Sequence, residues 1–270
     1  MYGILTGDPS VARSGVGDVT YFLAERTDGT RREPVEDTVT TVCCFGDTMT
    51  VEHDPERAAV AADGTRSTPT AEGHHWGTVC PTDPGYRAAL LERLEDLGDV
   101  RLSTCGFPGT DFCHCERCER LFRESGHDDR MAWRCDVITS FVAAASERVT
   151  GDISVTLYPD PHPGGLVERQ GLSLERVVEH VDGVLVPLCG DYGTPYWVET
   201  LASGFGRRLA DCPVETTIQL SVADSSVGTL ADVTRMVEPH CDTVVYGTFP
   251  GDLETVRAVI GRRRGTAISA

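Results

Sequence analysis

The feature that most constrains the fold of this chain is a repeated unit of a short β-rich run, a Gly/Pro/Asp loop and a helical stretch. From residue 152 onward the unit recurs at intervals of about 30 residues. Val, Ile, Leu, Thr and Tyr dominate the β-rich runs, which predict strands near Ser154–Tyr158, Val181–Leu188, Val214–Leu220 and Thr243–Tyr246. Strands that alternate with helices in this way are typical of an α/β fold with a parallel sheet.

The same alternation continues upstream with less regular spacing. Strands are predicted at Tyr2–Leu5, Thr38–Phe45 and Val100–Thr104, with helices at about 14–26, 84–97 and 115–148 and a break in the last at 126–128. The apolar tail Thr266–Ser269 is predicted to supply an eighth strand. Eight such positions predict one (β/α)8 TIM barrel over residues 1–270 that lacks its last helix, and the alternative is an open doubly wound sheet of six or seven strands.

The charge balance restricts the partners that we expect. The chain has 42 acidic residues against 24 basic ones, all of them Arg, and a net charge of −18. Repulsion by this negative charge disfavours binding to nucleic acid and anionic membranes, and a small neutral or cationic ligand fits better. The composition resembles that of proteins from salt-accumulating halophilic archaea. Residues 1–9 show no basic leader before a long apolar run, so we expect a cytoplasmic protein whose 11 cysteines are not a disulfide framework.

One loop is much longer than a barrel needs. Between Gly46 and Pro84 nearly 40 residues separate a predicted strand from its helix, where about two to six are ordinary. Loops that follow barrel strands gather at the carboxyl end of the sheet, where ligands bind. The insertion at about 46–83 is therefore expected on the functional face. It carries His74, His75 and Trp76, residue types that stack on sugar rings and hydrogen-bond their hydroxyls.

The strongest local motif is a C-x-C-x-x-C run formed by Cys113, Cys115 and Cys118, within a loop at about 105–118. Soft sulfur ligands at this spacing suit tetrahedral zinc, which needs a fourth ligand from elsewhere. Cys80 is the preferred fourth ligand. It follows the predicted strand Thr38–Phe45, which neighbours the predicted strand Val100–Thr104 that precedes the motif. Cys105 and His127 are alternatives. Four thiolates leave no open position, so the zinc is predicted to be structural. The other reading is three buried thiols without a metal.

These segments resemble parts of known enzymes. Three segments are similar to glycoside-hydrolase-type TIM barrels, namely Trp76–Arg87, Gly106–Gly109 and the cysteine run up to Phe122. The cysteines resemble the four-cysteine zinc site of glycoside hydrolase family 42 β-galactosidases, and Cys80–Arg87 resembles the C-P-x-x-P-x-Y-R segment of uncharacterised glycoside-hydrolase-like families. The close likeness covers roughly residues 58–125 and implies a barrel with zinc. Where many such barrels carry an Asp on the strand before the Phe-Pro pair, this chain has Ser103.

Hydrolysis of a glycosidic bond needs two carboxyl groups that flank the bond. Asp160 and Asp191 follow neighbouring predicted strands and are the expected catalytic pair, although each could instead be a turn residue. Asp111, which we also expect to bind substrate, and Glu215 form the reserve pair.

Three further residues at strand ends, His162, Tyr192 and Trp197, are expected to contact the ligand, although aromatic residues there could instead cap the core. The sequence therefore predicts a glycoside-hydrolase-like enzyme that acts on a carbohydrate or glycoconjugate. The alternative is a noncatalytic zinc-containing barrel that binds a ligand or serves as a scaffold.

Overall fold

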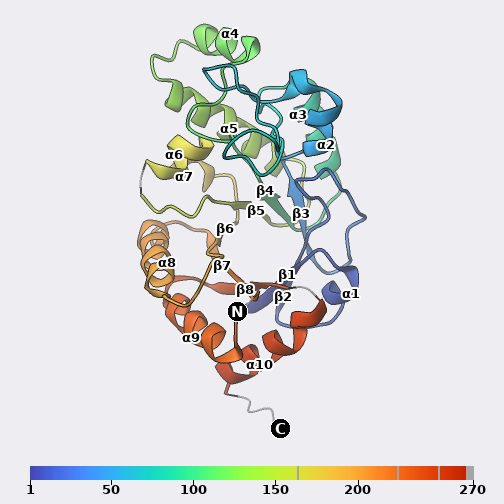
Figure 1. Ribbon diagram of the computed structural model, residues 1–270, viewed down its shortest axis with the longest axis vertical. Coiled ribbons are helices and arrows are strands. Elements are labelled where there is room, and N and C mark those ends of the chain that lie inside the picture. The colour runs from blue at the N-terminus through green and yellow to red at the C-terminus, as the bar shows by residue number, and fades with distance from the viewer. Residues whose placement is uncertain (163, 224, 249, 266–270) are drawn as a thin grey trace.

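A closed barrel of eight parallel strands in sequence order lies at the centre of the computed structural model, which describes residues 1–162, 164–223, 225–248 and 250–265 (Figure 1). Parallel pairing of β1 with both β2 and β8 closes the barrel. The strands are β1 (Tyr2–Thr6), β2 (Val19–Phe22), β3 (Val39–Cys43), β4 (Val100–Ser103), β5 (Ile153–Thr156), β6 (Gly183–Pro187), β7 (Glu215–Ser221) and β8 (Thr243–Gly247). The closure confirms the predicted (β/α)8 barrel and excludes the open sheet.

Helices surround the barrel and follow every strand except β2, after which β3 comes with no helix between them (Figure 1). They are α1 (Pro9–Ala12), α2 (Thr48–His53), α3 (Pro84–Leu94), α4 (Glu116–Ser125), α5 (Arg130–Ser146), α6 (Gly165–Gln170), α7 (Leu174–Val177), α8 (Tyr196–Leu209), α9 (Val227–Val237) and α10 (Leu253–Arg263). Side chains of Asp83, Asp129 and Ser226 cap the starts of α3, α5 and α9. Gly126 ends α4 in the left-handed conformation, which confirms the predicted break.

Two expectations about the ends of the barrel are wrong. The predicted helix at about 14–26 contains β2, because the β-branched and aromatic run Val19–Phe22 pairs with β1 and β3. Gly17 precedes β2 at φ +84°, and a Cβ there would lie 2.7 Å from the carbonyl oxygen of Tyr2. The last helix is present, since α10 follows β8. The strand predicted at Thr266–Ser269 lies outside the described residues.

Strand alternation divides the sheet residues between two environments. Helix-facing residues such as Ile4, Leu102 and Val155 are fully buried against the helices. Alternate residues face the inside of the barrel, which we call the bore. Its apolar part is a cluster of Leu5, Tyr21, Leu185 and Val245. On β4, Arg101 lies between the helix-facing Val100 and Leu102, so its side chain faces the bore.

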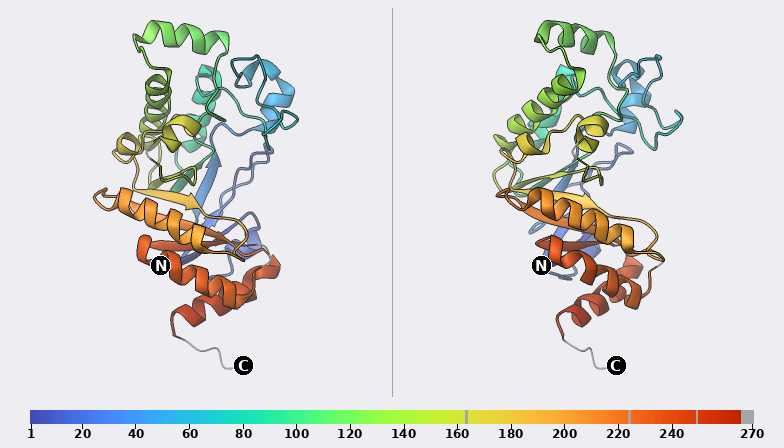
Figure 2. Two further views of the ribbon diagram at one scale, coloured as in Figure 1. Left: turned by 60° about the vertical axis from the view of Figure 1, so that its left-hand side comes forward. Right: turned by 90° about the vertical axis from the view of Figure 1, so that its left-hand side faces the viewer.

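The long segment between β3 and α3 lies beside α4 at one end of the molecule (Figure 2). Isolated antiparallel bridges join Gly46 to Thr78 and Ala58 to Val79, and another joins Ala61 to Phe112 in the cysteine loop. Backbone pairing therefore links the two segments that supply the predicted metal ligands. Among the helices in the described ranges, none has both the length and the apolar character of a transmembrane span.

Candidate functional site

Four cysteine thiols converge where these two segments meet. The Sγ atoms of Cys80, Cys113, Cys115 and Cys118 all lie within 4.8 Å of one another. The Sγ of Cys80 is 3.8 Å from that of Cys115 and 3.4 Å from that of Cys118. A tetrahedral zinc–thiolate centre with Zn–S bonds of about 2.3 Å has sulfur–sulfur edges of about 3.8 Å. The donor set and its spacing therefore fit one tetrahedral metal ion.

The alternative fourth ligands are engaged elsewhere. The Nε2 atom of His127 lies 2.6 Å from Asp136 Oδ2. The Cys105 thiol lies against the Cys44 thiol and raises the pKa of Cys44, which burial also raises. Cys80 thus completes the group, as predicted.

The thiols act on one another through hydrogen bonds. These contacts lower the pKa values of Cys115 and Cys113 and raise those of Cys80 and Cys118. The backbone N–H of Val60 donates to Cys113 Sγ at 3.3 Å, and that of Cys118 donates to Cys115 Sγ at 3.5 Å. Such outer contacts fix the orientation of metal ligands. The group can therefore act as a clamp between the segment after β3 and the start of α4.

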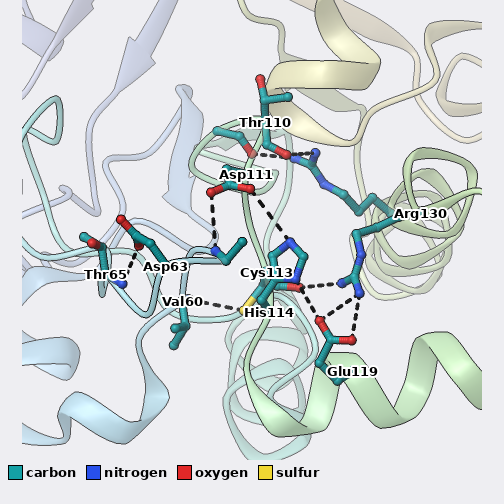
Figure 3. Close-up of polar contacts among 12 residues, drawn as sticks. Val60, Asp63, Thr65, Thr110, Asp111, Cys113, His114, Glu119 and Arg130 are labelled. Carbon is teal, nitrogen blue, oxygen red and sulfur yellow. Dashed lines mark hydrogen bonds and ion pairs between the residues drawn. The ribbon is translucent and has the colours of Figure 1, made fainter.

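A network of charged side chains surrounds the cysteine loop (Figure 3). Arg130 donates two hydrogen bonds to Glu119, at 2.8 and 2.9 Å, and a third to the carbonyl oxygen of Cys113 at 3.0 Å. Glu119 also lies 2.8 Å from Nδ1 of His114. Although burial raises the pKa of Glu119, hydrogen bonds from His114 and Arg130 lower it overall. Asp111 accepts a hydrogen bond from the N–H of Ala62 at 3.3 Å, so it ties the loop to the long segment.

A cavity of about 350 Å³ opens at the carboxyl ends of β3, β4 and β5. Aromatic rings, hydrogen-bonding side chains and glycine and proline backbone form its walls. The lining residues are Gly73, His74, His75, Trp76, Thr78, Thr104, Gly106, Phe107, Pro108, Gly109, Tyr158, Arg169 and Gln170. The predicted ligand residues His74, His75 and Trp76 are among them, and no Asp or Glu of the described part of the chain is. The long segment therefore contributes to the cavity wall, as does Tyr158, an aromatic residue at a strand end. Arg169 and Gln170 also line the cavity, although their sequence context gives no such indication.

Contacts between loops position this wall. Gln170 accepts from the N–H of Tyr158 through Oε1 at 2.7 Å and from the N–H of Phe107 through its backbone oxygen at 2.9 Å. The Arg169 guanidinium lies 4.7 Å from the centre of the Tyr158 ring. The end of α6 thus joins the loops after β4 and β5. Helical periodicity does not reveal this role, because it depends on how α6 packs.

Thr104 is a strained residue in the same wall. It has φ +50°, which is rare for a β-branched residue. Its Oγ1 accepts from the N–H of Gly46 at 3.2 Å and donates to the carbonyl oxygen of Ser103 at 2.8 Å. Strain of this kind persists where surrounding structure fixes it and is frequent at ligand sites.

The two histidines and Trp76 differ in how they are held. His74 Nδ1 lies 3.2 Å from Ser67 Oγ, and its ring meets the edge of Phe112 at 5.3 Å. Burial lowers the pKa of His74. Trp76 is 37% exposed and its ring lies 6.2 Å from that of His75. A partly exposed indole at a cavity wall offers a stacking face to a ligand.

Asp160 and Asp191 both take part in turns of their own loops. Asp160 Oδ1 accepts from the N–H of His162 at 2.9 Å, and Asp191 Oδ1 accepts from the N–H of Gly193 at 2.8 Å. These are the turn contacts that short acidic side chains make with the backbone two residues on. Neither carboxylate lines the cavity. Their loops do follow the adjacent strands β5 and β6 at the same end of the barrel.

The other expected ligand residues lie outside the cavity lining. Tyr192 is 4% exposed, and its hydroxyl donates to the carbonyl oxygen of Leu188 and accepts from the N–H of Ser221, both at 2.8 Å. Trp197 stacks on Tyr192 with ring centres 6.2 Å apart. These rings brace the loop after β6. His162 is exposed and accepts a hydrogen bond from Gly164.

Glu215 cannot join Asp111 in one site. It is the first residue of β7 and is exposed at the amino end of the barrel, opposite the cavity. Asp111 belongs to the loop after β4, at the carboxyl end. The reserve pair is therefore wrong, because strand direction separates the two carboxylates.

Two buried carboxylates at the carboxyl end do not stand out in the sequence. Glu25 lies 2.9 Å from Arg93 Nε, and Asp47 lies 2.9 Å from Arg31 NH2. Asp47 also accepts hydrogen bonds from Tyr86 Oη at 3.1 Å and from the N–H of Thr50 at 2.9 Å. Both acids are neutralised by arginine, which fits a structural role after β2 and β3.

Comparison with known proteins places the chain by fold. No protein-family model matches it, and no curated protein matches it by sequence. The PgaB (BpsB) glycoside hydrolase domain from Bordetella bronchiseptica is similar over 100% of this chain and 99% of its own, with a TM-score of 0.68 and 12% identity. Alpha-L-fucosidase isoenzyme 2 from Paenibacillus thiaminolyticus is similar over 95% of this chain and 45% of its own, with a TM-score of 0.62 and 8% identity. The chain has a glycoside-hydrolase-like barrel.

Proposed function

We propose that this barrel binds a carbohydrate or glycoconjugate in the cavity at the carboxyl ends of β3 to β5. The observation that carries the proposal is the composition of the cavity wall, in which three aromatic residues, Trp76, Phe107 and Tyr158, stand among hydrogen-bonding side chains. Pyranose rings offer apolar faces to such rings and hydroxyls to such polar groups. The glycoside-hydrolase-like fold supports the same ligand class.

The metal in this proposal is a structural zinc ion. Four thiolates suit zinc and leave no position for a reacting water. The ion would hold the segment that carries Trp76 against the loop after β4, which supplies Phe107 to the cavity. Zinc would therefore affect ligand binding indirectly, because it would fix the shape of the cavity wall.

Hydrolysis by Asp160 and Asp191 is a second candidate function. Two observations favour it: both residues follow adjacent strands at the cavity end, and Tyr158, two residues before Asp160, lines the cavity. Both carboxylates would have to leave their present turns to flank a bond. Since no Asp or Glu among the described residues lines the cavity, ligand binding without hydrolysis is the better-supported function.

Calorimetric titration with neutral gluco-, galacto- and N-acetylglucosamine oligosaccharides tests the binding proposal. We expect at least one series to bind the wild-type protein and to bind Trp76→Ala about tenfold or more weakly, because an aromatic anchor is lost. Tyr196→Ala is the matched control, since Tyr196 is 70% exposed on α8 outside the cavity. Equal loss in both variants, or no binding by the wild type, would contradict the proposal.

Turnover of aryl glycosides separates the two candidate functions. Activity in the wild type that disappears in Asp160→Asn and in Asp191→Asn would support hydrolysis. Saccharide binding without turnover in the wild type would support the noncatalytic function.

A further inference from the structure

Arg101 is a buried cation with no partner in the described part of the chain. It is 4% exposed and faces the bore from the middle of β4. Its Nε atom is buried without a hydrogen-bond partner, and no hydrogen bond or ion pair of its guanidinium occurs among the described residues. Leaving a buried charge unpaired is costly, so such a group is uncommon unless it has another use.

Arg134, the other arginine that is buried to this extent among the described residues, is partnered. Its guanidinium donates to the carbonyl oxygens of Gly109, Thr110 and Glu168, although its Nε, like that of Arg101, has no partner. The half-buried Arg93 pairs with Glu25 at 2.9 Å. Arg101 differs from both, because no hydrogen bond or ion pair of its guanidinium occurs among the described residues.

No neighbouring group neutralises Arg101. Burial lowers the pKa of Arg101 to about 10, so the side chain stays charged at neutral pH. The groups that act on its charge are Cys43, Tyr21 and Cys189, from three parts of the barrel, and no carboxylate is among them. Burial raises the pKa of Cys43 to about 12 and also raises the pKa values of Tyr21 and Cys189. All three are neutral at pH 7.

Two of the three groups that act on the charge of Arg101 lie toward the carboxyl end of the barrel. Cys43 is the last residue of β3, and Cys189 is exposed just beyond β6. The inward-facing residues that end β4 and β5, Ser103 and Thr156, are half-buried, whereas the adjacent helix-facing residues are fully buried. The bore is therefore accessible from this end.

Thr104 connects Arg101 with the cavity. Its side chain contacts Cys43, which acts on Arg101, and Thr104 also lines the cavity wall. Arg101 is three residues before Thr104 on the same strand. Arg101 is not itself a lining residue, but its place on β4 puts it in the bore next to this part of the cavity wall.

We propose that Arg101 is an anion-binding group and that the carbohydrate bound at the cavity carries an oxyanion substituent, a carboxylate or a sulfate, that pairs with it. This inference rests on the proposed function and narrows its ligand class to acidic saccharides. It departs from the expectation of a neutral or cationic ligand, which considers the net charge of −18 and not the local charge of the bore. A guanidinium presents a planar fork of N–H donors that matches such groups in two parallel hydrogen bonds. The hydroxyl of Thr156, which is buried without a partner, is a further donor on the bore.

The test is calorimetric titration of cellobiose, its C6-oxidised uronate and its 6-sulfate at constant ionic strength. The wild-type protein is expected to bind one or both acidic forms about tenfold or more tightly than cellobiose, and Arg101→Met is expected to abolish that difference. The better acidic form identifies the oxyanion. Arg262→Met is the matched control, because Arg262 is exposed and has no ion pair among the described residues.

Thermal unfolding supplies a second readout. Because Arg101→Met removes an unpaired buried charge, we expect its unfolding midpoint without ligand to equal or exceed that of the wild type. Arg101→Lys keeps the positive charge but loses the planar fork of N–H donors, so it should also bind the acidic saccharide more weakly than the wild type. This variant serves as the test if Arg101→Met does not fold.

The outcomes separate the inference from the proposed function. Equal affinity of the wild type for neutral and acidic saccharides would overturn the inference and leave carbohydrate binding intact. If no saccharide binds but inorganic sulfate raises the unfolding midpoint of the wild type and not of Arg101→Met, the carbohydrate proposal fails and the anion site stands. A lower midpoint of Arg101→Met with an unchanged acidic preference would make Arg101 structural.

Discussion

Removal of one metal ligand by Cys115→Ser should destabilise the protein by an amount that the length of the closed loop predicts. A metal held by Cys80 and by the cysteine run joins two points of the chain separated by a loop of about 33 residues between Cys80 and Cys113. If the cross-link acts on the unfolded chain as a disulfide does, closing such a loop contributes about 4 kcal/mol to the free energy of unfolding. That is a large share of the roughly 5–15 kcal/mol that stabilises a typical domain.

The assay is urea unfolding of the zinc-loaded protein, the chelator-treated protein and the Cys115→Ser variant, with zinc measured by elemental analysis. The loaded wild type should hold one zinc ion per chain, and the other two samples should hold none and unfold at lower urea. Cys212→Ser is the matched control, because Cys212 is half-buried outside the four-cysteine group. It should retain both the zinc and the stability.

Two results would refute this reasoning. One is full zinc content in Cys115→Ser, which would place the metal elsewhere or give it another ligand. The other is a difference below about 1 kcal/mol between loaded and metal-free wild type, which would show that the bridges between the segments persist without the ion.

Three further predictions concern charge and backbone. The melting temperature should rise from dilute buffer to molar salt, because salt screens the repulsion among the acidic side chains that give the net charge of −18. A melting temperature that does not change with salt would show that these charges are paired locally instead. Burial raises the pKa of Glu238, but hydrogen bonds from Arg263 and Tyr2 lower it overall. The Glu238 carboxylate therefore stabilises the folded protein at pH values above the pKa that it has in the unfolded chain. This stabilisation is lost as pH falls through its pKa in the folded protein. Glu238→Gln should therefore lose about 1–3 kcal/mol in urea unfolding at pH 7 and progressively less below about pH 4.5, and a loss independent of pH would contradict this. Gly17→Ala should lower the melting temperature more than Gly15→Ala, since both have positive φ but only at Gly17 would a Cβ collide with backbone, and equal losses would show that strain alone acts.

The regular part of the fold could be predicted from the sequence because seven strands carry runs of β-branched or aliphatic residues long enough to recognise. β2 was missed because four residues between a glycine pair and a charged segment give no clear period. The barrel has eight strands, as predicted, and β2 is the one that the sequence analysis does not include. The strand predicted at 266–269 lies outside the described residues.

The metal ligands and the cavity differ in how far they could be predicted. The spacing of the cysteines predicts three ligands, Cys113, Cys115 and Cys118. The order of the strands predicts that Cys80 lies beside them, because loops after neighbouring strands meet at the carboxyl end of the barrel. The cavity wall contributed by Arg169 and Gln170 depends on the packing of α6 against two loops, which local sequence does not encode. Likewise, nothing in the sequence distinguishes Arg101 from partnered arginines, since its lack of a partner is a property of the closed bore.

The most direct test of the central claim is an NMR titration that follows the three indole N–H signals of the 15N-labelled protein with the saccharide that binds best in calorimetry. Trp76 lines the cavity, Trp133 is buried, and Trp197 stacks on Tyr192 outside the cavity lining. We expect the signal that disappears in Trp76→Phe to shift in a saturable way while the other two stay in place. A shift of the Trp197 signal without one of Trp76, or no shift at saturating saccharide, would contradict carbohydrate binding in this cavity.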